Sequence, residues 1–191
     1  MSTLFLVRHA EPELTGVLLG RIDPPLSEMG AREAHERLAN LKVEAVYSSP
    51  LRRALETAQT IEGAAIEVIE ELAEIGLGEW DGLRWSAIER RDPDLARRKL
   101  ADWFGVTPPG GEPWSAFEKR ISRALDRIRQ GRFPAAVVSH IGVNAALARL
   151  IAGIDPASFQ QEYCQIERYD FDKSASHPGA DSSPDGRATR E

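Results

Sequence analysis

Two histidines each follow a short run of apolar residues, and an arginine stands beside one of them. His9 ends the stretch TLFLVRH, which begins at Thr3, and His140 ends the stretch AAVVSH, which begins at Ala135. Arg8 directly precedes His9. A neutral imidazole offers a lone pair that can attack an electrophile, and a guanidinium offers planar donors that match phosphate oxygens. These residue types together indicate chemistry on a phosphoryl group.

Two further arginines, Arg52 and Arg53, follow a third apolar run, AVYSS at 45–49. Taken singly, these residues have ordinary interpretations: a histidine held by structural hydrogen bonds, or arginines solvated on a helix. Their combination favours a site, because the carboxyl ends of parallel strands meet at one sheet edge, where ligands of α/β proteins bind. Neighbouring guanidiniums disfavour protonation of an imidazole, and they neutralise phosphoryl oxygens during transfer.

Apolar runs and amphipathic segments alternate along the chain and predict an α/β domain that positions these residues. We expect strands at 3–7, 44–49, 64–69, 135–140 and 165–171, and helices at 27–41, 49–61 and 142–153. Ser27 and Ser49 are expected to cap the first two helices, and Gly153 is expected to end the last one. The strand at 165–171 alternates apolar and polar residues, which is typical of a sheet edge.

Length and composition limit the class of protein. The chain has 191 residues, 42% of them hydrophobic, which suits one domain with a core of its own. The net charge of -6 argues against a surface for nucleic acid or for an anionic membrane. Cys164 is the single cysteine, and no stretch resembles a signal peptide or a membrane span. We therefore expect a cytoplasmic protein.

The segment from Leu77 to Pro113 has no regular pattern, and it concentrates the tryptophans. All four lie within it or one residue beyond: Trp80, Trp85, Trp103 and Trp114. Two interpretations stay open at this point. The rings either pack a smaller subregion over the sheet, or they contact a partly apolar leaving group, such as a nucleoside-like moiety.

Five motifs follow one another in a family order: RHA at 8–10, GRIDPPLSEMG at 20–30, YSSPLRRALETAQTI at 47–61, EIGLGEWDG at 74–82 and VVSHIGVNAAL at 137–147. With these motifs, the chain resembles the histidine phosphatase superfamily, the phosphoglycerate mutase-like proteins. The resemblance implies a three-layer α/β/α sandwich around a mostly parallel sheet. We expect the histidine phosphatase domain at 1–172. A disordered tail is expected at 173–191, which has no large apolar residue.

The resemblance assigns roles to the basic residues of these motifs. It implies that His9 is the nucleophile that becomes phosphohistidine, and that Arg8 beside it is a phosphate ligand. The family spacing selects Arg53 as the second phosphate ligand, so that Arg52 is interpreted as a solvated charge or a charge at the substrate rim. His140 corresponds to the second pocket histidine, which bonds the phosphoryl oxygens.

The resemblance also implies a general acid and two substrate-binding residues. Glu74 corresponds to the acid that protonates the leaving oxygen. The residues alone do not choose it, because a proton donor needs only a position beside the leaving group. Arg21 is at a position that helps bind substrate, and Thr15 is expected to donate a hydrogen bond to phosphate. The competing carboxylates are Glu70, Glu71 and Glu79.

The chain departs from the family pattern near the first loop and after the second histidine. Ala10 replaces the usual glycine, which is tolerable only if the backbone stays in a common conformation. Pro12 and Thr15 stand where many members have threonine and asparagine, and Pro12 offers neither a hydroxyl nor an N–H. Ile141 stands where glycine is common. These departures affect expected substrate contacts and leave the His-Arg-Glu set intact.

The resemblance implies a phosphomonoesterase that hydrolyses a small phosphorylated metabolite through a phosphohistidine on His9, in the manner of small phosphatases such as alpha-ribazole phosphatase. No metal or cofactor is expected, since no two histidines have the spacing of metal ligands. The alternatives are a phosphoglycerate-type phosphomutase and a catalytically weak phospho-ligand binding protein. We expect no nucleic-acid or membrane partner, and the oligomeric state stays open, with a homodimer as one option.

Overall fold

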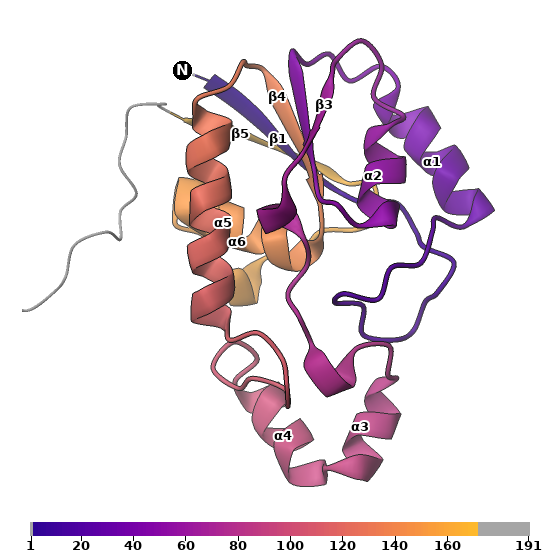
Figure 1. Ribbon diagram of the computed structural model, residues 1–191, viewed down its shortest axis with the longest axis vertical. Coiled ribbons are helices and arrows are strands. Elements are labelled where there is room, and N and C mark those ends of the chain that lie inside the picture. The colour runs from indigo at the N-terminus through magenta and orange to yellow at the C-terminus, as the bar shows by residue number, and fades with distance from the viewer. Residues whose placement is uncertain (1, 172–191) are drawn as a thin grey trace, which may run out of the picture.

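The computed structural model describes residues 2–171 and contains a five-stranded sheet with helices on both sides (Figure 1). The strands are β1 (Ser2–Arg8), β2 (Ala45–Ser48), β3 (Ile66–Val68), β4 (Ala135–Ser139) and β5 (Ile166–Phe171). The helices are α1 (Glu28–Leu38), α2 (Arg52–Ala58), α3 (Trp85–Arg91), α4 (Pro93–Ala101), α5 (Trp114–Arg129) and α6 (Ile141–Ala152). Short 3₁₀ helices are η1 (Glu70–Leu72), η2 (Gly78–Trp80) and η3 (Pro156–Ser158). The tail predicted at 173–191 lies outside the described residues.

Parallel pairing brings the ends of three strands to one edge of the sheet. The strand order is β3-β2-β4-β1-β5. The first four strands are parallel, and β5, the outermost strand beside β1, runs antiparallel to it. Arg8 of β1 lies beside Ser139 of β4, and Ser48 of β2 lies beside Val138. The residues that follow these three strands are therefore neighbours in space, although the chain separates them widely.

Alternate residues of the central strands enter two separate cores. Leu4 and Leu6 of β1 pack in the core that includes α5 and α6, whereas Val7 packs with residues of α1 and α2. Figure 1 shows α1 and α2 on one side of the sheet and α5 and α6 on the other. Because successive side chains of a strand point to opposite faces, each strand supplies both cores. The predicted three-layer α/β/α sandwich and the predicted edge strand at 165–171 are confirmed.

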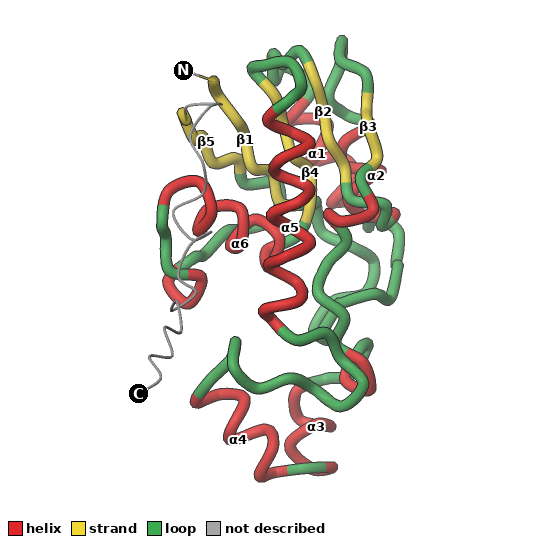
Figure 2. Tube along the Cα trace, turned by 60° about the vertical axis from the view of Figure 1, so that its left-hand side comes forward, coloured by secondary structure: helices red, strands yellow, loops and turns green. Residues whose placement is uncertain are grey.

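A smaller unit that contains α3 and α4 lies beyond the sheet, past the N-terminal end of α5 (Figure 2). It has a core of its own, which includes Trp80 and Ile88. Trp80 is buried and meets the ring of Trp85 edge-on, with ring centroids 5.9 Å apart. Trp103, by contrast, is 40% exposed. The tryptophans therefore divide between packing and an accessible surface.

The start of α2 differs from the sequence-based expectation. Ser49 was expected to cap this helix, but the helix begins at Arg52 and its N-cap residue is Leu51, with no side-chain capping bond. The Oγ atom of Ser49 accepts a hydrogen bond from the backbone N–H of Leu51 and lies 2.8 Å from Nε2 of His140. The expected caps of the other helices are confirmed: Ser27 accepts from Gly30 N–H, and Gly153 ends α6 with φ of 70°.

A buried hydrogen-bond network joins β4, α6 and the segment before β5. Ser139 Oγ donates to Asn144 Oδ1 at 2.6 Å, and Asn144 Nδ2 donates to Gln161 Oε1 at 2.8 Å. Gln161 Nε2 in turn donates to the carbonyl of Leu6 in β1 at 2.9 Å. All members are buried, so each depends on its neighbour for the hydrogen bonds that water would otherwise supply. This hydrogen-bond network holds the segment before β5 against the end of the sheet.

Gln161→Ala is expected to lower the free energy of unfolding by about 2–3 kcal/mol, because it leaves the buried Asn144 amide without its acceptor. Gln160→Ala is the matched control: Gln160 is exposed, so its loss is expected to cost no more than about 0.5 kcal/mol. Urea unfolding of both variants measures the difference. Equal effects of the two substitutions on the free energy of unfolding would show that the buried hydrogen-bond network does not stabilise this segment.

Candidate active site

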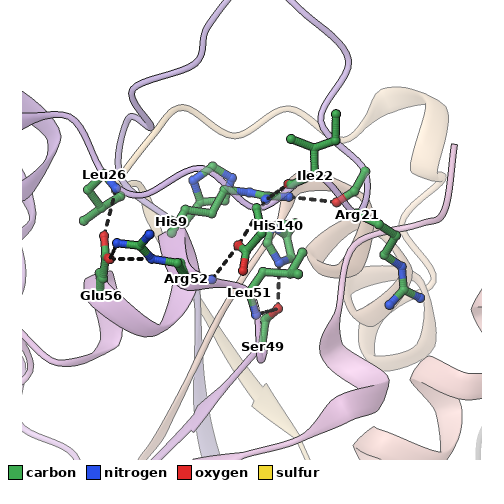
Figure 3. A network of polar contacts seen from close by, with 12 residues as sticks. His9, Arg21, Ile22, Leu26, Ser49, Leu51, Arg52, Glu56 and His140 are labelled. Atoms are coloured by element: carbon green, nitrogen blue, oxygen red, sulfur yellow. Dashed lines mark hydrogen bonds and ion pairs between the residues drawn. The ribbon is translucent and has the colours of Figure 1, made fainter. Parts of the chain in front are cut away.

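Two histidines and a serine meet where three parallel strands end. His9 follows β1, His140 follows β4 and Ser49 follows β2. The backbone N–H of His9 donates to the carbonyl of Ser139 at 2.9 Å, which extends the sheet pairing by one residue. The ring centroids of His9 and His140 are 5.1 Å apart, and Figure 3 shows the two side chains side by side. The predicted convergence of the two imidazoles is present.

The tautomer of His9 follows from its hydrogen bond. Nδ1 of His9 lies 2.7 Å from the carbonyl oxygen of Ala10, which can only accept, so Nδ1 carries the proton and Nε2 keeps its lone pair. Burial, assisted by the charges of Arg53 and Arg8, lowers the pKa of His9 to about 3. The imidazole is therefore neutral at physiological pH. Its free nitrogen, Nε2, is the one available for nucleophilic attack.

His140 is also held neutral. Burial and the adjacent His9, with the arginines behind it, lower the pKa of His140 well below its usual value. Nε2 of His140 lies 2.8 Å from Ser49 Oγ, and its buried Nδ1 makes no hydrogen bond within residues 2–171. A buried ring nitrogen without a partner is unfavourable, and an oxygen of a bound ligand would satisfy it.

Arg53 places a buried positive charge in the site, and a loop holds it in position. Its side chain has no exposed surface; Nη1 donates to the carbonyl of Ile22 at 2.8 Å and Nη2 to that of Gly20 at 3.0 Å. The carboxylate of Asp81 fixes this loop, since it accepts from the backbone N–H groups of Gly20 and Ile22. Asp23 lies 3.9 Å from Nη1, too far for a hydrogen bond. Burial lowers the pKa of Arg53, which shows how strongly its charge is desolvated.

Arg8 supplies a second guanidinium from the end of β1. Nη1 donates to the carbonyl of Gln161 at 2.6 Å, and the guanidinium carbon lies 4.2 Å from the centre of the Tyr163 ring. Nε of Arg8 is buried and makes no hydrogen bond to the described residues, and the same is true of Nε of Arg53. Each guanidinium is thus fixed by its outer nitrogens while donor capacity remains for an anion.

Glu74 brings a carboxyl group to the same end of the sheet as His9 and His140. Oε1 accepts from Ile75 N–H at 2.8 Å, and Oε2 accepts from Gly142 N–H, in the first turn of α6, at 3.1 Å. Burial raises the pKa of Glu74, although these N–H donors and the arginines oppose the shift. A side chain at position 142 would displace this carboxylate, because its Cβ would lie 2.4 Å from Oε1.

The competing carboxylates lie elsewhere. Glu70 and Glu79 are exposed, and Glu79 forms an ion pair with Arg91. The carbonyl of Glu71 accepts from Arg120. Of these acids and Glu74, only Glu74 borders the cavity beside His9.

A buried ion pair clamps the segment that carries Glu74. Arg120 of α5 donates through Nη1 to the carbonyl of Ala73 at 2.7 Å and through Nη2 to that of Glu74 at 3.0 Å. Its Nε donates to Oε1 of Glu112 at 2.7 Å, and Oε2 of Glu112 accepts from Gly76 N–H at 3.2 Å. The clamp therefore fixes the backbone on both sides of the carboxyl group. Arg120 acts on Glu74 as a positioning residue.

A cavity of about 510 Å³ opens beside these groups. Arg8, His9 and Glu74 line it, whereas Arg53 and His140 are not among its lining residues. The two predicted substrate-binding residues are placed differently. Thr15 is exposed and is not part of the cavity wall.

Arg21, the other predicted substrate-binding residue, has a side chain that is 48% exposed, and its Nη2 lies 3.7 Å from Oε2 of Glu112. Figure 3 shows its guanidinium directed away from His9. The structure therefore gathers the five predicted catalytic residues and leaves Arg21 and Thr15 at the periphery. Their roles in substrate binding stay predictions.

The departures from the family motif at Ala10 and Ile141 fit the fold. Ala10 is buried with an ordinary backbone conformation, and its N–H donates to Thr57 Oγ1 at 2.9 Å. Ile141 begins α6, and the glycine that leaves room for the Glu74 carboxylate follows it at position 142. Gln161 and Arg120 were not found from the sequence, because they belong to no motif and act only through contacts between distant elements.

Neither a metal site nor a membrane segment is evident between residues 2 and 171. No three side chains of histidine, cysteine, aspartate or glutamate gather there in a way that could hold a metal ion. None of the helices in this part of the chain is both long and apolar enough to cross a bilayer. Cys164 is buried among apolar residues, and burial raises the pKa of its thiol to about 12.

The low pKa of His9 predicts that its imidazole stays neutral at mildly acidic pH. With a pKa of about 3, only about 1% of the ring is protonated at pH 5. In a proton NMR titration from pH 8 to pH 5, the ring resonances of His9 are expected not to move, while those of free imidazole in the same tube do. His9→Asn assigns the signals. A midpoint above pH 5.5 for His9 would contradict the electrostatic description.

Comparisons with known proteins agree with this geometry. The sequence model of the histidine phosphatase superfamily (branch 1) matches residues 4–177. The chain is 32% identical over 179 residues to phosphoserine phosphatase 1 of Hydrogenobacter thermophilus, covering 88% of this chain and 85% of that protein. The crystal structure of the alpha-ribazole phosphatase from Shigella flexneri superposes with a TM-score of 0.78 at 28% identity, covering 89% and 91% of the two chains.

A third relative is a longer protein. The chain is 39% identical over 160 residues to a bifunctional protein of Mycobacterium tuberculosis, and it spans 44% of that protein's length. The matched part covers 78% of the present chain. With the family match extending over most of its sequence, the chain belongs to the histidine phosphatase superfamily.

Proposed function

We propose that the protein is a phosphomonoesterase that hydrolyses a small phosphorylated metabolite through a phosphohistidine on His9. The observation that carries the proposal is the Nδ1–H bond of His9 to the Ala10 carbonyl, which leaves Nε2 unprotonated beside two guanidiniums. Two of the three named relatives, phosphoserine phosphatase 1 and the alpha-ribazole phosphatase, are phosphatases by name, which supports hydrolysis as the reaction class.

In the first half of the reaction, Nε2 of His9 attacks phosphorus, so that a P–N bond forms as the bond to the ester oxygen breaks. In this step the carboxyl group of Glu74, whose pKa burial raises, gives its proton to the departing oxygen, which leaves as an alcohol. Arg8, Arg53 and His140 bind the phosphoryl oxygens and neutralise their charge during transfer.

In the second half, a water molecule attacks the phosphohistidine, and the carboxylate of Glu74 takes the water's proton. The P–N bond breaks, inorganic phosphate leaves, and His9 and Glu74 return to their starting protonation states. The proposal assigns no step to a metal or cofactor, because two guanidiniums and two imidazoles provide the charge and the nucleophile. The cytoplasmic location and the oligomeric state stay predictions.

A phosphomutase is the alternative that shares this chemistry. It would return the phosphoryl group to a second hydroxyl of the substrate rather than to water, so it would need to retain a phosphorylated acid. Phosphorus NMR of the products separates isomerisation from release of free phosphate. A binding protein without turnover is disfavoured, since the nucleophile, the acid and the phosphate ligands are all present in one place.

The phosphohistidine can be trapped directly. Acid-labile label is expected on the wild-type protein after brief incubation with a ³²P-labelled aryl phosphate and rapid denaturation at alkaline pH. His9→Asn is expected to remove the label and to lower the turnover rate by about 10⁴-fold or more. His35→Asn, which changes an exposed histidine of α1, is the control and keeps both. A chelator in excess should leave turnover unchanged; label that survives His9→Asn would refute the assigned nucleophile.

The general acid can be tested by changing the leaving group. Glu74→Gln keeps the shape of the side chain but cannot deliver a proton, so kcat for an alkyl phosphate is expected to fall by about 10²–10⁴-fold. The loss for p-nitrophenyl phosphate should be much smaller, because its leaving oxygen is stable without a proton. Glu79→Gln alters an exposed rival and should change neither. Equal losses on both substrates would indicate that Glu74 only binds or positions.

Because Glu74 must be protonated to act as an acid, kcat/KM should fall as the pH rises through its raised pKa. Its protonated form dominates below that pKa, and the low pKa of His9 keeps the nucleophile available on the acidic side.

A further inference from the structure

The cavity continues well beyond the phosphoryl site, and its outer walls are apolar. One wall is the loop before α1, another is the segment after α4, and the third is formed by residues near η3. Representative lining residues are Val17, Leu18, Trp103, Phe104, Val106 and Phe159. The volume of about 510 Å³ lies in the range of pockets that enclose a whole small molecule. A phosphoryl group fills only a small part of it.

The two charged side chains in the outer cavity are already engaged. Nζ of Lys99 donates to the carbonyls of Trp103 and Val106, the latter at 2.6 Å, and its side chain is buried. Glu112 accepts from Arg120 on both carboxylate oxygens. Two of the three N–H donors of Lys99 and both carboxylate oxygens of Glu112 thus have partners within the protein. A charged group on a substrate would have to compete with these partners after losing its own water.

The aromatic wall is held in place before any ligand binds. Lys99 ties the loop after α4 through the two carbonyls, and Gly105 N–H donates to Asp102 Oδ1 at 2.7 Å. The ring of Phe104 meets that of Trp114 edge-on, with centroids 4.5 Å apart. Trp103 is nevertheless 40% exposed at the cavity. An exposed indole on a fixed loop is surface that a ring-bearing ligand would cover.

We propose that the leaving group is an uncharged, apolar, ring-bearing alcohol, which Trp103 and Phe104 contact while its phosphate occupies the site at His9. This inference rests on the proposed phosphomonoesterase activity and specifies its substrate class. Small esters whose leaving group carries a charge of its own, such as phosphorylated amino acids and phosphorylated sugar acids, are poor substrates by the same reasoning.

The test compares three phosphates of primary alcohols, so that the departing oxygens are chemically similar: 2-naphthylmethyl phosphate, glycerol phosphate and O-phospho-L-serine. The kcat/KM for the naphthyl ester is expected to exceed that for phosphoserine by at least about 100-fold. Trp103→Ala and Phe104→Ala should each reduce the ratio of naphthyl to glycerol ester by about tenfold or more. Leu100→Ala removes an exposed side chain of α4 outside the cavity wall and should preserve both the ratio and the activity.

The outcomes separate the two proposals. If the three esters and p-nitrophenyl phosphate are all inert, the phosphomonoesterase itself is refuted, and the substrate class with it. If esters are hydrolysed but phosphoserine is used as well as the naphthyl ester, the activity stands and the substrate class is overturned. An unchanged ratio in both Trp103→Ala and Phe104→Ala also overturns it, because the proposed contacts would then not discriminate.

Discussion

The structure depends on keeping a positive charge buried where three strands end. Arg53 has no exposed surface, and its direct hydrogen bonds within the site go to backbone carbonyls rather than to a carboxylate. Removing a guanidinium from water is unfavourable by several kcal/mol, on the order expected for a buried ion. The fold offsets this through fixed carbonyl dipoles and through the ion pair of Nη1 with Asp23 at 3.9 Å, while neither Nη1 nor Nη2 donates a hydrogen bond to a carboxylate. A dianionic phosphoryl group is the ligand that such a charge favours.

The same charge explains the state of the imidazoles. With Arg53 and Arg8 nearby and water excluded, His9 remains neutral, and its hydrogen bond to Ala10 directs the lone pair to Nε2. Glu74 experiences the opposite balance, because burial outweighs the arginines and raises its pKa. The two environments therefore move the pKa values of His9 and Glu74 in opposite directions, which is the arrangement that the proposed nucleophile and acid require.

Much of this site could be predicted from the sequence, because its basic residues follow apolar runs. His9 and His140 end strands that pair in parallel, so their meeting follows from the topology. Residue types alone did not select Glu74 among the nearby carboxylates, and only its place in the family motif did, because its burial against Gly142 is a tertiary contact. Ser49 was misassigned for a related reason: a serine before a helix is typical of a cap, but here its hydroxyl faces His140.

The contacts that hold the site were beyond prediction because they join elements from distant parts of the chain. Arg120 of α5 positions the segment of Glu74, and Gln161 anchors Arg8 through its carbonyl. The apolar cavity likewise forms only when the loop after α4 folds over the sheet end. Local patterns predict which residues can react, whereas the substrate they select depends on packing between separate parts of the chain.

A crystal structure of the protein with orthovanadate, which mimics a phosphoryl group in transfer, tests whether His9 is the nucleophile. We expect vanadium bonded to Nε2 of His9, with vanadate oxygens in contact with Arg8, Arg53 and His140. Vanadate bound through Nδ1, or bound away from both histidines, would contradict this expectation.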